Sequence, residues 1–211
     1  LEGVQLGFDP TYASADLAEG YATAVSEHVS LLASLGATIR EVRMPESLRE
    51  YLEAWPVLCS SEAAFAHRDT FPAQADSYGP WFRQWLERGN AYSAADYAAA
   101  FQQRLACNGA ISKTFEGIDA LVFPGSAQVA HPVTPGSMWG PIPAGRDSWH
   151  SRFTVPFDYN GYPTLSLPAG LSEEGLPYSL QLAANPLQEA LLIQLGTAFE
   201  GATAFHTQHP P

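Results

Sequence analysis

The first 42 residues contain three successive patterns that together predict an α/β sheet. Residues 4–8 form a short apolar strand candidate that ends at Asp9. Apolar residues then recur at helical spacing until Gly36, which stands where a C-terminal helix cap belongs. Residues 38–42 alternate like a second strand. A strand, a helix and a strand of these lengths make a right-handed crossover unit, so we expect an α/β fold.

The middle of the chain, residues 46–117, has the spacing of a helical layer. One helix is predicted over 46–68, and a Pro- and Gly-interrupted aromatic segment covers 71–89. A further helix begins at Ser93, which together with Asp96 forms a loose capping box. The stripe that we expect this helix to bury consists of Tyr97, Phe101, Leu105, Asn108, Ser112 and Phe115.

Strand patterns return after the helical layer. A strand is predicted at residues 119–123, where four apolar residues follow Asp119. Further strands are predicted at about 164–168 and 178–182, and a closing helix at 188–199. Residues 124–150 are rich in Pro and Gly and lack periodicity, and a loop of this length is usually functional or mobile. We therefore divide one domain into a strand-helix-strand part (1–45), the helical layer (46–117), and a part with the returning sheet, a pocket loop and the closing helix (118–211).

Composition narrows the classes of partner. The chain is 46% apolar and 12% aromatic, which is typical of a folded globular protein. A formal net charge of −12 disfavours nucleic acid as a partner, and no apolar run approaches the roughly 18 residues of a membrane helix. Cys59 and Cys107 lie in helical patterns and are expected to be reduced thiols, which favours a cytoplasmic location.

The most specific motif lies in the last third of the chain. Residues 153–170 read F-T-V-P-F-D-Y-N-G-Y-P-T-L-S-L-P-A-G, and residues 175–182 read G-L-P-Y-S-L-Q-L. This segment resembles the closing section of the amidase signature family, whose pattern is close to F-T-x-P-x-N-x-x-G-x-P-x-x-S-x-P-x-G and then G-L-P-x-x-x-Q. Residues 117–124, 185–192 and 205–211 resemble further landmarks of that family in the same order. Asp158 and Ser179 depart from the pattern, which commonly has Asn and Gly there.

The resemblance implies an α/β fold with a mixed β-sheet core flanked by helices, and it implies that residues 1–211 are the C-terminal portion of one amidase-signature domain. It also implies hydrolysis of a carboxamide through a serine acyl-enzyme, with a second serine in a cis peptide and a lysine, and without a metal or organic cofactor. In the family these residues lie in a Gly/Ser-rich segment of the N-terminal half, and these 211 residues contain no such segment. We therefore expect no catalytic residue here. The expected partner is an N-terminal segment or chain that carries the catalytic residues, and a homodimer of the complete enzyme is compatible with this. Alone, the chain should aggregate or stay molten, because strands near Val4 and Phe123 would lie exposed.

The resemblance also places the acyl-binding channel beside residues 154–158 and the loop after Phe123. The end of a strand is the usual ligand position in an open α/β sheet, and Thr154, Phe157 and Asp158 would share one face of a helix. Asp147, Trp149, His150 and Arg152 form a polar-aromatic cluster that is either a solvated loop or a substrate-lining segment. The candidate substrate-binding residues are Pro124, Gly125, Ser126, Trp149, Thr154, Phe157 and Asp158, for which ordinary core or turn roles are the alternative.

Other reactive side chains are weaker candidates. Ser60 and Ser61 lie in a predicted helix without a Gly-rich turn that could form an oxyanion hole. Lys113, the single lysine, lies near a helix C-terminus, where a cation complements the helix dipole. His206 and His209 have metal-ligand spacing, but the prolines that follow argue against a helix there.

Two other functions stay open. The parent protein could be the glutaminase subunit of a transamidase, which would need a polar glutamine-binding set that the sequence does not identify. The chain could also be a non-catalytic binding or scaffold domain. The aromatic residues between 55 and 101 indicate an aromatic or apolar substrate, although core packing explains most of them.

Overall fold

The computed structural model describes residues 1–140 and 148–208, which divide into two compact units. The first, the sheet unit, contains residues 1–46, 108–130 and the chain from His150 onward. The second, the helical unit, contains residues 47–107 and 131–149. In the described ranges, no helix has both the length and the apolar character needed to cross a membrane.

The sheet unit is built on a five-stranded mixed sheet, as predicted. Its strands are β1 (Gln5–Phe8), β2 (Thr38–Glu41), β3 (Ala120–Pro124), β4 (Thr164–Leu171) and β5 (Pro177–Ala184). They lie in the order β2-β1-β3-β5-β4. β1 is parallel to β2 and β3, whereas β5 is antiparallel to both of its neighbours. The α/β fold class is therefore confirmed.

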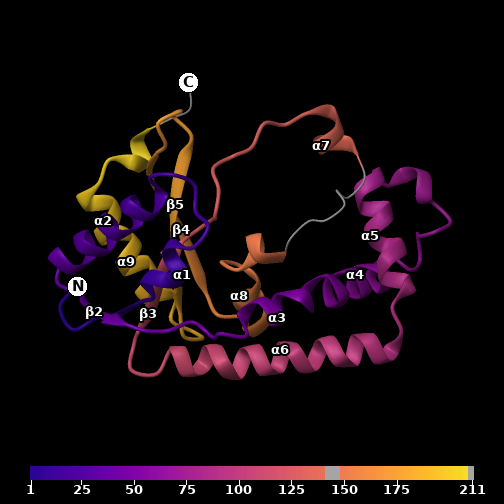
Figure 1. The fold of residues 1–211 in the computed structure, drawn as a ribbon, viewed down its shortest axis with the longest axis horizontal. Coiled ribbons are helices and arrows are strands. Elements are labelled where there is room, and N and C mark those ends of the chain that lie inside the picture. The colour runs from indigo at the N-terminus through magenta and orange to yellow at the C-terminus, as the bar shows by residue number, and fades with distance from the viewer. Residues whose placement is uncertain (141–147, 209–211) are drawn as a thin grey trace. The chain divides into compact units, whose positions relative to one another are not determined.

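Two helices cover one face of this sheet. α2 (Tyr21–Ser34) and α9 (Glu189–Ala202) lie on the same side of the strands (Figure 1). Their apolar side chains join those of alternate strand positions in one core, which includes Leu6, Val25, Leu32, Val122, Leu182, Leu195 and Phe199. The short helices α1 (Pro10–Ser14), α8 (Val155–Asn160) and η3 (Phe205–Thr207) also belong to this unit.

The edge strands differ from those that the sequence predicted. β1 and β3, the strands near Val4 and Phe123, are interior, and the edges are β2 and β4. The error arose because sequence order does not reveal that β5 inserts between β3 and β4. β2 carries the charged residues Arg40 and Glu41, and β4 carries Pro168, all of which discourage pairing with another chain. The prediction that the isolated chain aggregates was based on exposed strands near Val4 and Phe123, and these strands are interior.

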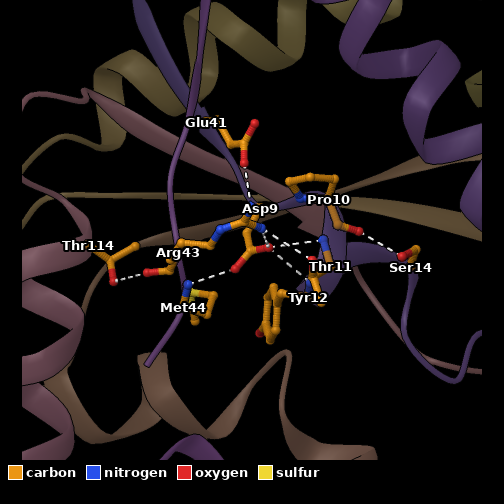
Figure 2. A network of polar contacts seen from close by, with 9 residues as sticks. All are labelled: Asp9, Pro10, Thr11, Tyr12, Ser14, Glu41, Arg43, Met44 and Thr114. Atoms are coloured by element: carbon orange, nitrogen blue, oxygen red, sulfur yellow. Dashed lines mark hydrogen bonds and ion pairs between the residues drawn. The ribbon is translucent and has the colours of Figure 1, made fainter. Parts of the chain in front are cut away.

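A buried carboxylate joins the end of β1 to the segment after β2. Asp9, 4% exposed, accepts hydrogen bonds from the backbone N–H groups of Thr11 and Tyr12 at the start of α1. Its other oxygen accepts from the N–H of Met44 at 2.7 Å, and Arg43 lies 3.3 Å from the first oxygen (Figure 2). The sequence pattern had indicated for Asp9 only the end of a strand.

The helical unit contains α3 (Leu48–Glu53), α4 (Trp55–Ala66), η1 (Ala75–Ser77), α5 (Pro80–Ala91) and α7 (Pro135–Trp139). The single helix predicted over 46–68 is wrong, since it divides at Ala54. Pro56 explains the division, because it has no N–H to donate to the carbonyl of Leu52. η2 (Ser148–Ser151) follows later in the chain. The loop predicted over 124–150 therefore contains one short helix among its described residues and part of η2.

α6 (Ala94–Thr114) begins at the predicted capping box. The N–H of Ser93 donates to the carboxylate of Asp96, and the N–H of Asp96 donates to the Ser93 hydroxyl. The predicted buried stripe is confirmed at Phe115, which is 4% exposed, and it is wrong at Phe101 and Leu105, which are 37% and 47% exposed. The buried positions include Ala100, Cys107, Ile111 and Phe115. The small residues Ala100 and Cys107 occupy the buried face where the prediction fails, because a search for large apolar residues selects Phe101 and Leu105 on the adjacent face instead.

Close packing of α4 and α5 leads to a stability prediction. A Cβ atom at Gly89 would lie 1.9 Å from the carbonyl oxygen of Ser60, which is backbone and cannot rotate away. We expect Gly89→Ala to lower the free energy of unfolding by about 3 kcal/mol, the upper part of the range for overpacking, measured by urea denaturation. Gly109→Ala in α6 is the control, because nothing lies within 4 Å of its Cβ position. It should raise stability by about 0.5–1 kcal/mol, and equal urea midpoints for the two variants would contradict the packing model.

The two cysteines give a second prediction. Both lie in the described part of the chain and neither forms a disulfide, as predicted. Burial raises the pKa of the Cys107 thiol to about 12 from 9.0. At pH 8 its thiolate fraction is thus lower by about three orders of magnitude, and iodoacetamide should modify it only after urea unfolding. Peptide mapping by mass spectrometry checks this, with Cys107→Ala identifying the peptide; rapid native alkylation of Cys107 would refute it.

Candidate functional site

The candidate site begins where β3 ends. Pro124 is buried, and the N–H of Gly125 donates to the carbonyl of Ser179 on β5 at 2.9 Å. A Cβ atom at Gly125 would lie 2.3 Å from the Ser179 hydroxyl oxygen and 3.1 Å from the Ser179 Cβ, so a larger residue would require the Ser179 side chain to move. The chain turns here toward Ser126, which is exposed.

Ser126 stabilises the turn that follows. Its hydroxyl donates to the carbonyl of Gln128 at 2.9 Å and accepts from the N–H of the same residue at 3.3 Å. The turn is attached to the linker between α1 and α2, because Ala18 N–H donates to Ala127 and the Gln128 side chain donates to the carbonyl of Asp16. These bonds give Ser126 a defined turn role, and its predicted contact with substrate stays a prediction.

An aromatic cluster connects the end of β3 to α8. The ring of Phe123, which is fully buried, stacks on Phe157 with 5.0 Å between centroids. Tyr12 and Phe153 complete the cluster, with centroids 4.9 Å from each other and 6.0 Å from that of Phe123. The Tyr12 hydroxyl donates to the carbonyl of Arg152 at 2.6 Å. The cluster therefore fixes the segment that carries Thr154 and Asp158 against the sheet.

Gln181 on β5 also holds the segment that carries Thr154 and Asp158 against the sheet. The side chain is 5% exposed, and its Nε2 donates to the carbonyl of Phe153 at 2.9 Å. Its Oε1 accepts from the hydroxyl of Ser166 on β4 at 3.2 Å. In the sequence this glutamine belonged to the motif but had no assigned role. The sequence feature that could have indicated this role is a single amide side chain within an apolar strand, because a buried amide needs hydrogen-bond partners.

α8 separates the three residues that were expected to share one face. Thr154, its N-cap, and Asp158 are four residues apart and both exposed. Phe157 is 3% exposed and belongs to the aromatic cluster. The common face is thus confirmed for Thr154 and Asp158, and it is wrong for Phe157, whose ring packs behind them. The core alternative applies to that residue.

Asp158 yields a prediction about pH. Desolvation raises the pKa of its carboxyl above 3.8, although the residue as a whole is exposed. Because the folded state then binds the proton more tightly than the unfolded state, stability falls as the pH rises from about 4 through the raised pKa. Asp158→Asn should remove this part of the pH dependence. Urea denaturation of both proteins between about pH 4 and 7 measures it, and parallel profiles would contradict the prediction.

Trp149 and its predicted cluster do not form one solvated loop. Trp149 lies in the helical unit, where the guanidinium of Arg49 is 4.6 Å from the centre of its ring. Arg152 lies in the sheet unit and is completely buried, with its guanidinium over the ring of Phe153 at 4.2 Å and a hydrogen bond to the carbonyl of Ala15. His150 is exposed, and Asp147 lies outside the described residues.

The structure also places the other reactive side chains that the sequence offered as weaker candidates. Ser60 is buried in α4 and its hydroxyl donates to the carbonyl of Pro56 at 2.6 Å. Lys113 lies in the last turn of α6, as expected. Within residues 1–140 and 148–208, no three His, Cys, Asp or Glu side chains gather as a metal site would require. His206 lies in the described part of the chain, whereas His209 lies outside it.

The mixed sheet flanked by helices agrees with the comparisons to known proteins. The sequence profile of the Amidase family matches residues 1–193. The chain belongs to the amidase signature family.

Individual relatives agree with this membership. A putative amidase, AmiD, of Mycobacterium tuberculosis is 36% identical over 154 residues, which cover 71% of this chain and 31% of that protein. A Glutamyl-tRNA(Gln) amidotransferase protein of Pediococcus pentosaceus is 27% identical over 239 residues and matches all of this chain with 47% of its own length. A bacterial aryl acylamidase of the amidase signature family has the same fold, with a TM-score of 0.80 at 18% identity, over 98% of this chain and 45% of its own. The chain thus spans less than half of each.

Proposed function

We propose that this amidase-family chain is the channel-bearing portion of an enzyme that hydrolyses carboxamide C–N bonds. The observation that carries the proposal is the family match, which extends over residues 1–193. Identity of 36% to the putative amidase AmiD over 71% of the chain supports the same class of reaction. The catalytic serine, cis-serine and lysine would be supplied by a segment outside these 211 residues.

In the complete enzyme, the serine attacks the carbonyl carbon and forms an acyl-enzyme while the amine leaves; water then releases the acid. This chain contributes the fold and the wall of the substrate channel. Thr154 and Asp158 are the residues most suited to contact substrate, since both are exposed on a segment that Phe123 and Gln181 hold in place. A hydroxyl and a carboxyl can both hydrogen-bond to an amide.

The test is reconstitution. The chain is produced together with the N-terminal half of an amidase signature relative, and ammonia or amine release is measured with aliphatic and aromatic amides. Turnover that requires both parts supports the proposal. Thr154→Ala and Asp158→Ala should then raise KM more than they lower kcat. Ser126→Ala tests whether the turn after β3 also contacts substrate, since Ser126 is a further candidate, and an unchanged KM would restrict Ser126 to its turn role. A folded, assembled complex without amide turnover would reject it.

The alternative function is glutamine hydrolysis within a transamidase. Its support is the Pediococcus pentosaceus amidotransferase protein, which aligns with the whole chain. Ammonia release from glutamine that depends on a partner protein would favour this alternative, and release from simple amides alone would favour the first. If the chain is a non-catalytic binding domain, neither activity should be observed. Light scattering of the complete enzyme tests whether it is a homodimer.

A further inference from the structure

The helical unit contains a hollow that the proposed hydrolysis does not use. Its volume is about 340 Å³, within the range of small-molecule pockets. It lies between α4, the end of α5 and the beginning of α6. The lining residues are Ser61, Glu62, Phe65, Gly89, Tyr92, Ser93, Ala94 and Tyr97.

The polar groups of the hollow include an acceptor with free capacity. The Tyr97 hydroxyl donates to Oε1 of Glu62 at 2.9 Å. This bond raises the pKa of the Tyr97 phenol, so the hydroxyl stays protonated and continues to donate at neutral pH. Because a carboxylate has two acceptor oxygens, Oε2 of Glu62 can accept from a ligand N–H.

A hydroxyl without a partner lies in the same wall. The Oγ atom of Ser61 is shielded from solvent and has no hydrogen-bond partner. A buried hydroxyl without a partner is unfavourable, since it has lost its water without gaining another bond. Rotation about χ1 between staggered positions can direct it into the hollow, where it can donate to a ligand carbonyl.

Charges of both signs surround the hollow and argue against an ionic ligand. Glu62 is the acidic residue among the described lining residues. Against it, Arg88 donates to the hydroxyl of Tyr92 at 2.8 Å, and the guanidinium of Arg68 lies 4.3 Å from the ring centre of Phe65. An ion of either sign would be attracted by one of these groups and repelled by another, so neither sign is favoured, whereas a neutral ligand is repelled by none of them.

We propose that this hollow binds a neutral aromatic or apolar carboxamide. The amide N–H groups donate to Glu62, the amide carbonyl accepts from Ser61, and the apolar body packs against the rings of Phe65, Tyr92 and Tyr97. A carboxamide is a neutral group with a donor and an acceptor side by side, which matches an adjacent carboxylate and hydroxyl. Binding here is independent of the proposed hydrolysis.

The test is a titration of the 211-residue chain with benzamide, in which binding is measured by isothermal titration calorimetry or ligand-observed NMR. Binding in the millimolar range is expected for so small a ligand. Ser61→Ala and Glu62→Ala should each weaken it roughly threefold to tenfold, the effect of one net hydrogen bond. Glu62→Gln keeps an acceptor oxygen and should weaken it less than Glu62→Ala. Glu87→Ala, an exposed change on α5 outside the lining, should have no effect.

Benzylammonium and benzoate test the ligand class. Both should bind more weakly than benzamide, and tighter binding of either would overturn the neutral class. If benzamide binds saturably and the binding survives both Ser61→Ala and Glu62→Ala, the ligand lies elsewhere and the proposed location is wrong. If the unaltered chain does not bind benzamide, the proposed binding site is wrong. Because the Ser61 hydroxyl has no partner, Ser61→Ala should not lower the free energy of unfolding, and a loss would contradict the proposal. The titration requires no turnover, so its failure leaves the proposed hydrolysis unaffected.

Discussion

Replacing Phe123 by alanine is expected to lower the free energy of unfolding by about 3–5 kcal/mol, the range for truncating a buried phenylalanine. The ring is 0% exposed and contacts the rings of Tyr12, Phe153 and Phe157. Its removal leaves a cavity under α8 and also loses the aromatic contacts, which contribute beyond their buried area. Urea denaturation followed by far-UV circular dichroism measures the loss.

Phe101→Ala is the matched control, because it removes the same side chain from a position on α6 that is 37% exposed. We expect it to lower the free energy of unfolding by less than about 1 kcal/mol. Phe123→Leu, which keeps most of the apolar volume, should restore part of the stability. A Phe123→Ala variant as stable as Phe101→Ala would show that the cluster is not the centre of the packing beneath α8.

Replacing Asp9 by alanine is expected to lower the free energy of unfolding by about 3 kcal/mol. The carboxylate caps α1 through Thr11 and Tyr12, and loss of such a cap costs about 1 kcal/mol. The N–H of Met44, bonded to Asp9 at 2.7 Å, would remain buried without an acceptor, which adds about 1–3 kcal/mol. The same denaturation experiment measures the change.

Two variants separate the contributions in this network (Figure 2). Asp9→Asn keeps one acceptor oxygen but turns an NH₂ group toward backbone donors, so it should lose an intermediate amount of stability. Arg43→Ala removes the ion pair with Asp9, and because the arginine side chain is 62% exposed the loss should stay below about 1 kcal/mol. A larger loss for Arg43→Ala than for Asp9→Ala would show that the ion pair, rather than the backbone acceptors, holds the network.

Local patterns predicted most elements but not their pairing. The strand patterns at 4–8, 38–42 and 119–123 correspond to β1, β2 and β3 within one or two residues. The edge strands were wrong, because which strands become neighbours depends on contacts between residues far apart in the chain. At α6 the capping box was confirmed. The buried stripe was confirmed at Phe115 and wrong at Phe101 and Leu105, because the small residues Ala100 and Cys107 occupy the buried face there.

The candidate site was predictable to a similar degree. The motif at 153–182 indicated the family and the segment that carries Thr154 and Asp158. It could not indicate that Phe157 faces the core or that Arg152 is completely buried. A helix of six residues presents more than one face, and the covering partner, here Phe123, lies more than thirty residues earlier in the chain.

By itself, the sequence determined the α/β class, the approximate position of the strands and helices, and membership of the amidase signature family. These follow from local spacing and from a contiguous motif, both of which can be read along the chain. Only the tertiary structure decided the strand order, the partners of Asp9 and Gln181, and the hollow beside Glu62 and Tyr97. The physical reason is separation along the chain: the hydroxyl of Tyr12 and the carbonyl of Arg152 are 140 residues apart, and only folding brings them within hydrogen-bond distance.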